Sequence, residues 1–157
     1  MGTKGDDRTK VSRNEPELVI TRTFDAPAHI VFKAWTTPEL FKQWWAPKSF
    51  GMKLVSVEQD VRVGGGYRVV FDRGEGQTMA FFGTYKEVVP NTRLVWTNEE
   101  SPEGPVTTVT FEGKGETTQL VLREVYPTKA GFDGSEGMED GMSEQFSQLD
   151  QLLATLR

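Results

Sequence analysis

The C-terminal segment, residues 138–156, has the sequence MEDGMSEQFSQLDQLLATL. Its large apolar side chains recur mostly at steps of three and four residues, which is the period of one face of an α-helix. These residues are Met138, Met142, Phe146, Leu149, Leu152, Leu153 and Leu156. The other positions are largely Glu, Gln, Asp and Ser. The segment is therefore predicted to be one amphipathic helix of about five turns, long enough to span a small sheet.

The region before this helix, from Phe50 to Val125, consists of β-rich runs separated by turn residues. Val, Thr, Tyr and Phe suit a pleated surface, whereas Gly, Pro and Asn mark turns. Strands are predicted at 53–60, 67–71, 79–88, 93–97, 106–112 and 118–125. Gly113-Lys114-Gly115 joins the last two and is a hairpin signal. Connections this short predict an antiparallel meander.

The N-terminal side adds a strand and two short helices. The predicted strand at 17–24 ends at Asp25-Ala26-Pro27, where Asp is a good N-cap and Pro is tolerated in the first helical turn. Thr37-Pro38-Glu39 repeats that start signal. The sequence thus predicts an α+β fold, in which a curved antiparallel sheet (a β-α-α-β meander) wraps around the long C-terminal helix. Residues 1–16 are predicted to be a disordered tail, and 17–157 to be one domain.

Composition excludes several classes of function. The net charge of −5 and the scattered basic residues argue against nucleic-acid binding. The absence of cysteine excludes disulfides, thiolate zinc sites and a cysteine nucleophile. No apolar run approaches the ~20 residues of a membrane-spanning helix. The polar residues 1–16 do not form a secretory signal, so a cytoplasmic protein without membrane partners is expected.

A series of short motifs resembles a known family. The series is Phe24-Asp25-Ala26-Pro27, Ile30-Val31-Phe32, Ala34-Trp35-Thr36, Pro38-Glu39-Leu40, Trp44-Trp45, Asp60-Val61-Arg62-Val63-Gly64-Gly65, Gly83-Thr84-Tyr85, Pro90-Asn91-Thr92-Arg93-Leu94-Val95 and the helix 137–153. In this order the motifs resemble START-like (SRPBCC) proteins, and more narrowly the branch homologous to the heat-shock-protein 90 ATPase activators. The resemblance runs from about Glu17 to Leu156.

This resemblance implies a helix-grip fold with a cavity between the concave sheet and the long helix. Members of the wider superfamily bind lipids, sterols, plant hormones or polyketides in that cavity, and some catalyse cyclisations or dehydrations. The family name is not itself evidence of work on a chaperone. Eukaryotic activators carry an additional N-terminal domain that contacts the chaperone, and this chain is expected to have no room for it.

The sequence offers no candidate catalytic residue and no metal or cofactor site. The single histidine, His29, is off the apolar face of its predicted helix and is interpreted as a surface residue. One histidine without cysteine cannot supply a His-rich zinc or iron site. Gly64-Gly65-Gly66 leads into a strand rather than a helix and is interpreted as a turn or bulge. Of Arg123 and Glu124, which face opposite sides of the final strand, at most one points inward.

The candidate ligand-binding residues are mainly aromatic residues and Met at positions expected to face inward. A cavity lined by apolar side chains with a few polar groups is typical of small-molecule sites. The set is Trp44, Trp45, Phe50, Glu58, Tyr67, Val69, Phe71, Met79, Phe81, Tyr85, Trp96, Val109, Phe111, Met138, Met142 and Phe146. Glu58 is included because it or Arg62 could orient a polar group of the ligand, although a cross-strand ion pair or a capped turn near Gly64 is the favoured interpretation.

Three hypotheses follow. The first is a non-catalytic protein that binds a small hydrophobic or amphipathic molecule, as a monomer or weak homodimer. The second is an enzyme of the same fold, of the cyclase, dehydratase or hydrolase type, which a cavity carboxylate with a raised pKa would favour. The third is an interaction module that stimulates a chaperone ATPase, which an exposed apolar patch outside the cavity would favour.

Overall fold

The computed structural model describes residues 9–51, 53–100, 102, 104–135 and 138–156. Along the chain the elements are β1 (Lys10–Asn14), β2 (Glu17–Phe24), α1 (Ala28–Thr36), α2 (Pro38–Trp44), η1 (Lys48–Phe50), β3 (Lys53–Gln59), β4 (Gly66–Gly74), β5 (Gln77–Val89), β6 (Arg93–Thr97), β7 (Val106–Lys114), β8 (Thr117–Val125), α3 (Lys129–Gly134) and α4 (Met138–Leu156).

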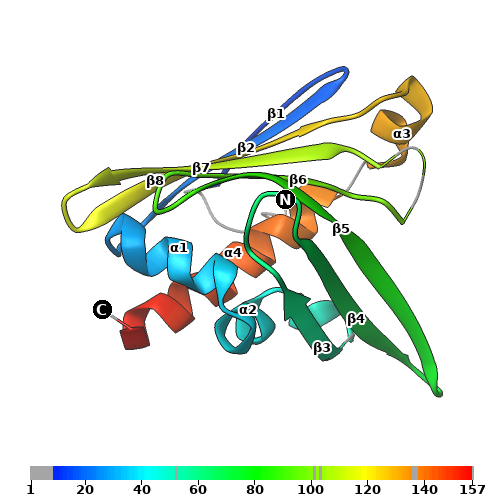
Figure 1. The fold of residues 1–157 in the computed structure, drawn as a ribbon, viewed down its shortest axis with the longest axis horizontal. Helices are drawn as coiled ribbons and strands as arrows, with labels where there is room; N and C mark the ends of the chain where they lie inside the picture. The colour runs from blue at the N-terminus through cyan, green and yellow to red at the C-terminus, as the bar shows by residue number, and fades with distance from the viewer. Residues whose placement is uncertain (1–8, 52, 101, 103, 136–137, 157) are drawn as a thin grey trace, which may run out of the picture.

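The strands form one 8-stranded sheet in the order β1-β2-β8-β7-β6-β5-β4-β3. Every neighbouring pair is antiparallel. The sheet is strongly curved, so that β3, β4 and the first part of β5 turn away from the strands β1, β2, β8, β7 and β6 (Figure 1). The strand order and the meander of successive hairpins confirm the predicted α+β helix-grip fold.

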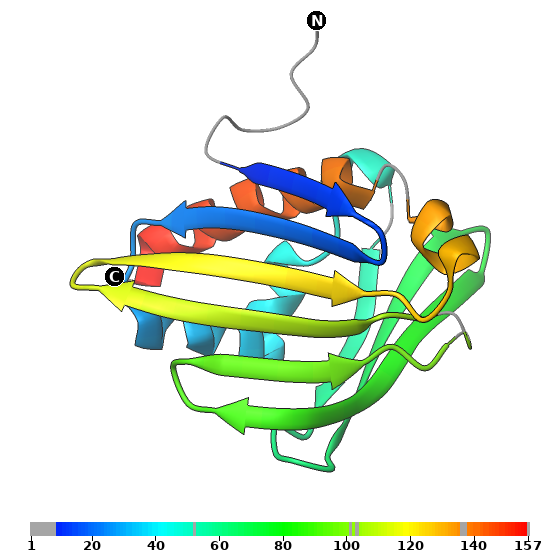
Figure 2. The same cartoon turned by 90° about the horizontal axis from the view of Figure 1, so that it is seen from above.

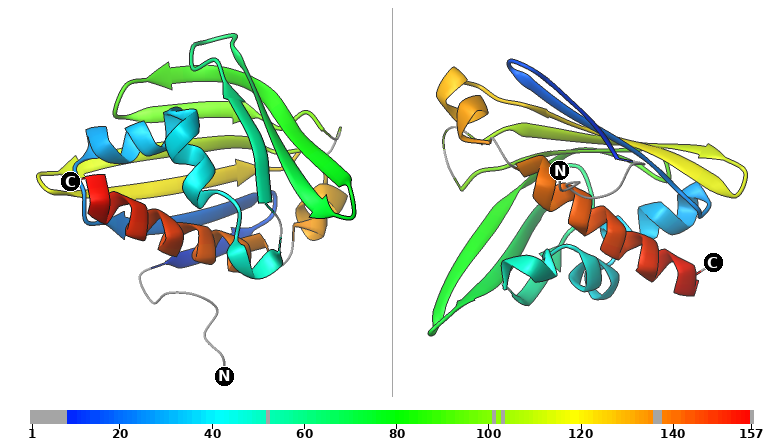
Figure 3. Two further views of the ribbon diagram at one scale, coloured as in Figure 1. Left: turned by 90° about the horizontal axis from the view of Figure 1, so that it is seen from below. Right: turned by 180° about the vertical axis from the view of Figure 1, so that it is seen from behind.

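The helices α1, α2 and α4 lie on the concave side of the sheet (Figure 3). Seen from the other side, the strands lie in front of the helices (Figure 2). Of the predicted apolar face of α4, Met142, Phe146, Leu149, Leu152 and Leu153 are buried. Phe146 packs edge-on against Phe24 of β2 with ring centroids 5.4 Å apart. The helix is also tied to the sheet by a buried ion pair between Asp150 and Arg22. Both contacts hold the C-terminal part of α4 against β2.

Most element boundaries lie within three residues of their predicted positions, but the first helix starts differently. The prediction of Asp25 as its N-cap is wrong: α1 begins at Ala28, its N-cap is Pro27, and no side chain caps it. Asp25 lies two residues upstream of the N-cap position, because Ala26 and the extended Pro27 separate it from the first helical turn. Thr37 is the N-cap of α2, with Pro38 in the first turn as predicted.

The N-terminal tail differs from its prediction. Lys10–Asn14 form an edge strand paired with β2, from Lys10 opposite Thr21 to Asn14 opposite Glu17. Its side chains are mostly polar and exposed, so periodicity could not identify it, and backbone pairing with β2 stabilises it instead. Residues 1–8 of the tail lie outside the described part of the chain.

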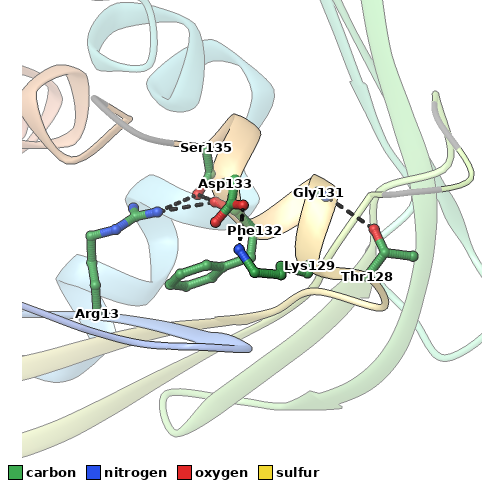
Figure 4. Close-up of polar contacts among 7 residues, drawn as sticks. All are labelled: Arg13, Thr128, Lys129, Gly131, Phe132, Asp133 and Ser135. Carbon is green, nitrogen blue, oxygen red and sulfur yellow. Dashed lines mark hydrogen bonds and ion pairs between the residues drawn. The ribbon is translucent and has the colours of Figure 1, made fainter.

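The short helix α3 was also not predicted. Thr128 is its N-cap, with the hydroxyl oxygen accepting a hydrogen bond from the Gly131 N–H at 3.0 Å. Arg13 of β1 donates hydrogen bonds to the Phe132 carbonyl and the Ser135 hydroxyl at 3.0 and 3.1 Å, and its guanidinium lies 4.5 Å from the centre of the Phe132 ring (Figure 4). The edge strand and α3 therefore hold each other in place.

The bend of the sheet occurs along β5, which pairs with β4 as far as Thr84 and with β6 from Tyr85 onward. Gly83 lies at this change of partner. A Cβ atom on Gly83 would lie 1.9 Å from the Thr97 carbonyl oxygen and 2.9 Å from the Tyr67 ring. Only glycine permits this close approach, because any other residue would push β6 away from β5.

We expect Gly83→Ala to lower the free energy of unfolding by about 1–3 kcal/mol, as over-packing does elsewhere. The matched control is Gly134→Ala, because a Cβ atom at Gly134 meets nothing within 4 Å and the backbone there is not left-handed. Urea unfolding of both variants measures the difference. Equal stability of the two variants would contradict this account of the bend.

Candidate functional site

A cavity of about 350 Å³ lies between the bent part of the sheet and the N-terminal part of α4. Strands β3, β4, β5, β6 and β8 contribute to its wall, together with α1, α2, the segment after α2 and the segment after β6. Its apolar wall includes Trp35, Phe41, Trp45, Val69, Phe71, Phe81, Leu122 and Met142. Its polar groups come from Gln59, Tyr67, Tyr85, Asn98, Glu100, Glu124, Tyr126 and Gln145.

Many of the predicted ligand-binding residues line this cavity. They are Trp45, Tyr67, Val69, Phe71, Phe81, Tyr85, Trp96 and Met142. The strand positions among them alternate along β4 and β5, which is why a period of two could identify them. Contact between these residues and a ligand stays a prediction.

Other predicted residues are in the core instead. Trp44, Val109, Phe111 and Phe146 are buried and do not line the cavity. The reason is the position of α1, which covers the sheet at β7: Phe32 packs edge-on against Phe111 at 5.3 Å. Trp44 is turned into the same core, where its indole N–H donates to the Ala34 carbonyl at 3.0 Å. The concave face is thus filled under α1, and the cavity opens only beyond it.

The remaining predictions have different outcomes. Met79 packs on the edge of the core, toward the tip of the β4–β5 hairpin, and does not line the cavity. Glu58 is exposed on β3, opposite Arg68, and does not line this cavity, so the geometry gives no support to its ligand-orienting role, the less favoured of its two interpretations. The side chains of Phe50 and Met138 lie outside the part of the structure that is described. His29 is exposed, as predicted.

A chain of hydrogen bonds runs along the polar side of the cavity. The Tyr67 hydroxyl donates to the Thr97 carbonyl at 2.8 Å and lies 3.1 Å from Oδ1 of Asn98. Asn98 donates to the hydroxyl of Thr107 at 2.9 Å. Thr107 in turn donates to the Glu124 carboxylate at 3.0 Å, and the Tyr126 hydroxyl donates to the other carboxylate oxygen at 2.8 Å. These bonds fix the orientation of Glu124.

Glu124 is the functional candidate that the predicted set omits. It is 6% exposed, and burial raises the pKa of its carboxyl, an effect that the hydrogen bonds from Tyr126 and Thr107 partly offset. Leu120 and Leu122 lie on the inner face of β8, and the same period of two places Glu124 on that face. This alternation is the feature of the sequence that could have identified Glu124. What the sequence could not show is that the strand remains regular to that point.

The chemistry available in the cavity is limited. Among the described residues that line it, none is Ser, Thr, His, Lys or Arg. Burial raises the pKa of Tyr85 to about 12, and burial also raises the pKa of Tyr67 and Tyr126, so these phenols are neutral near pH 7. Glu124 is a cavity carboxylate with a raised pKa, but the geometry around it provides a fixed acceptor without a neighbouring nucleophile.

Among the described residues, no group of three or more His, Cys, Asp or Glu side chains is placed to hold a metal ion. No helix within the described ranges is both long enough and apolar enough to cross a membrane.

Comparisons with known proteins agree with the fold. The family model described as "Activator of Hsp90 ATPase homolog 1-like protein" matches residues 25–154. No curated protein matches the sequence. Among solved structures, a Rhodobacter sphaeroides protein has a TM-score of 0.87 at 23% identity, covering 95% of this chain and 99% of its own. A Nitrosomonas europaea protein has a TM-score of 0.83 at 24% identity, covering 92% and 97%. A Chromobacterium violaceum protein has a TM-score of 0.75 at 28% identity, covering 89% and 98%.

Proposed function

Because the chain belongs to the family of activator of Hsp90 ATPase homolog 1-like proteins, a START-like branch with the helix-grip fold, we propose that it is a binding protein. Its ligand is a small hydrophobic or amphipathic molecule, held without catalysis between the sheet and α4. The observation that supports this proposal is the aromatic lining of the cavity.

The size and the wall of the cavity suit such a ligand. About 350 Å³ is within the range of small-molecule sites. Phe71 and Phe81 pack edge-on at 5.4 Å on one side, and Trp35 and Trp45 lie 5.9 Å apart on the other. Phe81 and Trp45 are only half-buried, so part of this apolar surface is left for a ligand to cover.

The test is native mass spectrometry of the protein after exposure to a mixed lipophilic extract. We expect an added mass on the wild-type protein and its loss in Phe81→Glu, because a buried charge in the apolar wall disfavours a hydrophobic ligand. The matched control is Phe82→Glu. Phe82 is the next residue of β5, lies outside the cavity and is 38% exposed, so this variant should keep the added mass.

Each other outcome contradicts the proposal in a different way. Loss of the added mass in both variants would indicate binding at the outer face of the sheet or a general loss of structure, which thermal melting separates. No added mass on the wild-type protein under any condition would contradict the proposal itself. The protein-interaction hypothesis would then become the leading one.

A further inference from the structure

The polar side of the cavity is acidic. Glu124 is almost completely buried, and Glu100 lies at the exposed rim. Among the described lining residues there is no Lys or Arg to balance these carboxylates. A polar group of a ligand that reaches this side therefore meets hydrogen-bond acceptors and negative charge, which repel an anion and attract a cation.

Three aromatic rings form a half-cage in the same cavity. The ring centroids of Tyr67 and Tyr85 are 5.8 Å apart, and Trp96 lies 6.3 Å from each of them. The hydrogen bond from Tyr67 to the Thr97 carbonyl fixes one ring, and the bond between Gln59 and the Tyr85 hydroxyl at 3.3 Å fixes another. The faces of such rings attract cations, and clusters of them recognise ammonium groups.

The half-cage and the carboxylates are neighbours. The hydrogen bonds through Asn98 and Thr107 connect Tyr67 to Glu124. Burial, followed by the charge of Glu100 and then those of Tyr85 and Glu124, raises the pKa of Tyr67, so the ring lies within the field of both carboxylates. The rings and the carboxylate therefore border the same cavity, where both can act on the polar end of one ligand.

We propose that the ligand of this cavity is an amphipathic amine, whose protonated nitrogen donates to the Glu124 carboxylate beside the half-cage of Tyr67, Tyr85 and Trp96. Its apolar body lies against the wall formed by Phe71, Phe81 and Trp45. This inference rests on the proposed function and adds to it the chemical class of the polar group. A ligand with a carboxylate or a neutral hydroxyl at that end is disfavoured.

The pH dependence of binding follows from the groups that face Glu124. They are Tyr67 on β4, Tyr126 after β8 and Glu100 after β6, with Arg13 of β1 beyond Tyr126. Burial raises the pKa of Glu124, so the apo protein holds a proton there at pH values where an exposed glutamate has lost it. A cationic ligand binds the ionised form, so its affinity rises as the pH rises through the raised pKa of Glu124.

The experiment compares three probes of similar size: 2-naphthylmethylamine, 2-naphthylmethanol and 2-naphthoic acid. Isothermal titration calorimetry at about pH 8 measures their dissociation constants, and titrations from about pH 5 to about pH 8 measure the pH dependence. We expect the amine to bind about tenfold or more tightly than the alcohol, because a charged hydrogen bond adds that much. Amine affinity should rise with pH, whereas alcohol affinity should stay flat.

The variant is Glu124→Gln, and its matched control for net charge is Glu112→Gln, on an exposed side chain of β7 outside the cavity. Gln keeps one acceptor oxygen but presents an amide NH2 in place of the other, where Thr107 and Tyr126 donate to the two oxygens of Glu124, so thermal melting at pH 8 checks that E124Q remains folded. E124Q should remove the amine preference, and E112Q should keep it.

If no probe binds the wild-type protein, the proposed function fails and this inference with it. If the probes bind but the alcohol or the acid equals the amine, or the wild-type amine affinity does not change with pH, the inference alone is overturned.

Discussion

Trp35→Ala is expected to destabilise the protein by about 3–5 kcal/mol, the cost typical of deleting a buried tryptophan. Trp35 is 1% exposed and joins the core to the cavity. Its ring centroid is 4.8 Å from Trp44, 5.9 Å from Trp45, 6.0 Å from Trp96, 6.1 Å from Phe111, 6.4 Å from Phe146 and 6.5 Å from Phe41. Deleting this side chain leaves a hole that these fixed neighbours cannot close.

Urea unfolding of Trp35→Ala and Trp35→Phe tests this prediction. The indole N–H of Trp35 has no hydrogen-bond partner among the described residues, so the loss comes from packing. Phenylalanine keeps an aromatic ring in the cluster, and Trp35→Phe should lose clearly less stability than Trp35→Ala. A loss below ~1 kcal/mol in Trp35→Ala, the size of an average substitution, would contradict the central position of this residue.

Asp150→Ala is expected to destabilise the protein by about 3 kcal/mol, at the lower end of what removing one partner of a buried ion pair costs. Arg22 on β2 has a fully buried side chain, and that of Asp150 on α4 is 21% exposed. Removing the carboxylate leaves the guanidinium charge buried without this counter-ion. The low end applies because the partial exposure of Asp150 already screens the pair.

Two further variants make the Asp150 result specific. Asp133→Ala removes a carboxylate from an exposed pair with Lys129, at 2.8 Å within α3, and should change stability little. The double variant Arg22→Met, Asp150→Leu should recover most of the loss, because apolar residues of similar size often replace a buried pair without penalty. A double variant less stable than Asp150→Ala would show that Arg22 stabilises the fold through its other contacts instead.

The regular elements could be predicted because they have a strong period. Residues 138–156 form α4 within the predicted bounds, and β6 spans the predicted Arg93–Thr97. The β7–β8 hairpin was located by glycine, and Gly115 indeed has a left-handed backbone with φ of 70°. Two short elements were not predicted. Strand β1 has no apolar face, and α3 is a short helix with glycines that contacts with Arg13 stabilise.

The candidate site was predictable on the strands and much less elsewhere. Alternation identified the cavity positions of β4 and β5, but it could not distinguish cavity from core, because that depends on where α1 covers the sheet. Trp44 and Trp45 illustrate this: adjacent residues point in different directions, one into the core and one to the cavity. Asn98 and Glu100 come from a segment without a period, and Glu124 depends on the exact register of β8.

The most direct test of the central claim uses the indole N–H signals of the four tryptophans in ¹H–¹⁵N spectra. Trp35, Trp45 and Trp96 line the cavity, whereas Trp44 does not and donates to Ala34 within the core. Signals assigned with single Trp→Phe variants are followed during titration with 2-naphthylmethylamine and 2-naphthylmethanol. Binding in the cavity predicts saturable shifts of the three lining indoles, with Trp44 changing least. Two results would contradict binding in the cavity. The first is no change in the indole signals, and the second is a set of shifts confined to backbone amide signals on the outer face around Phe82.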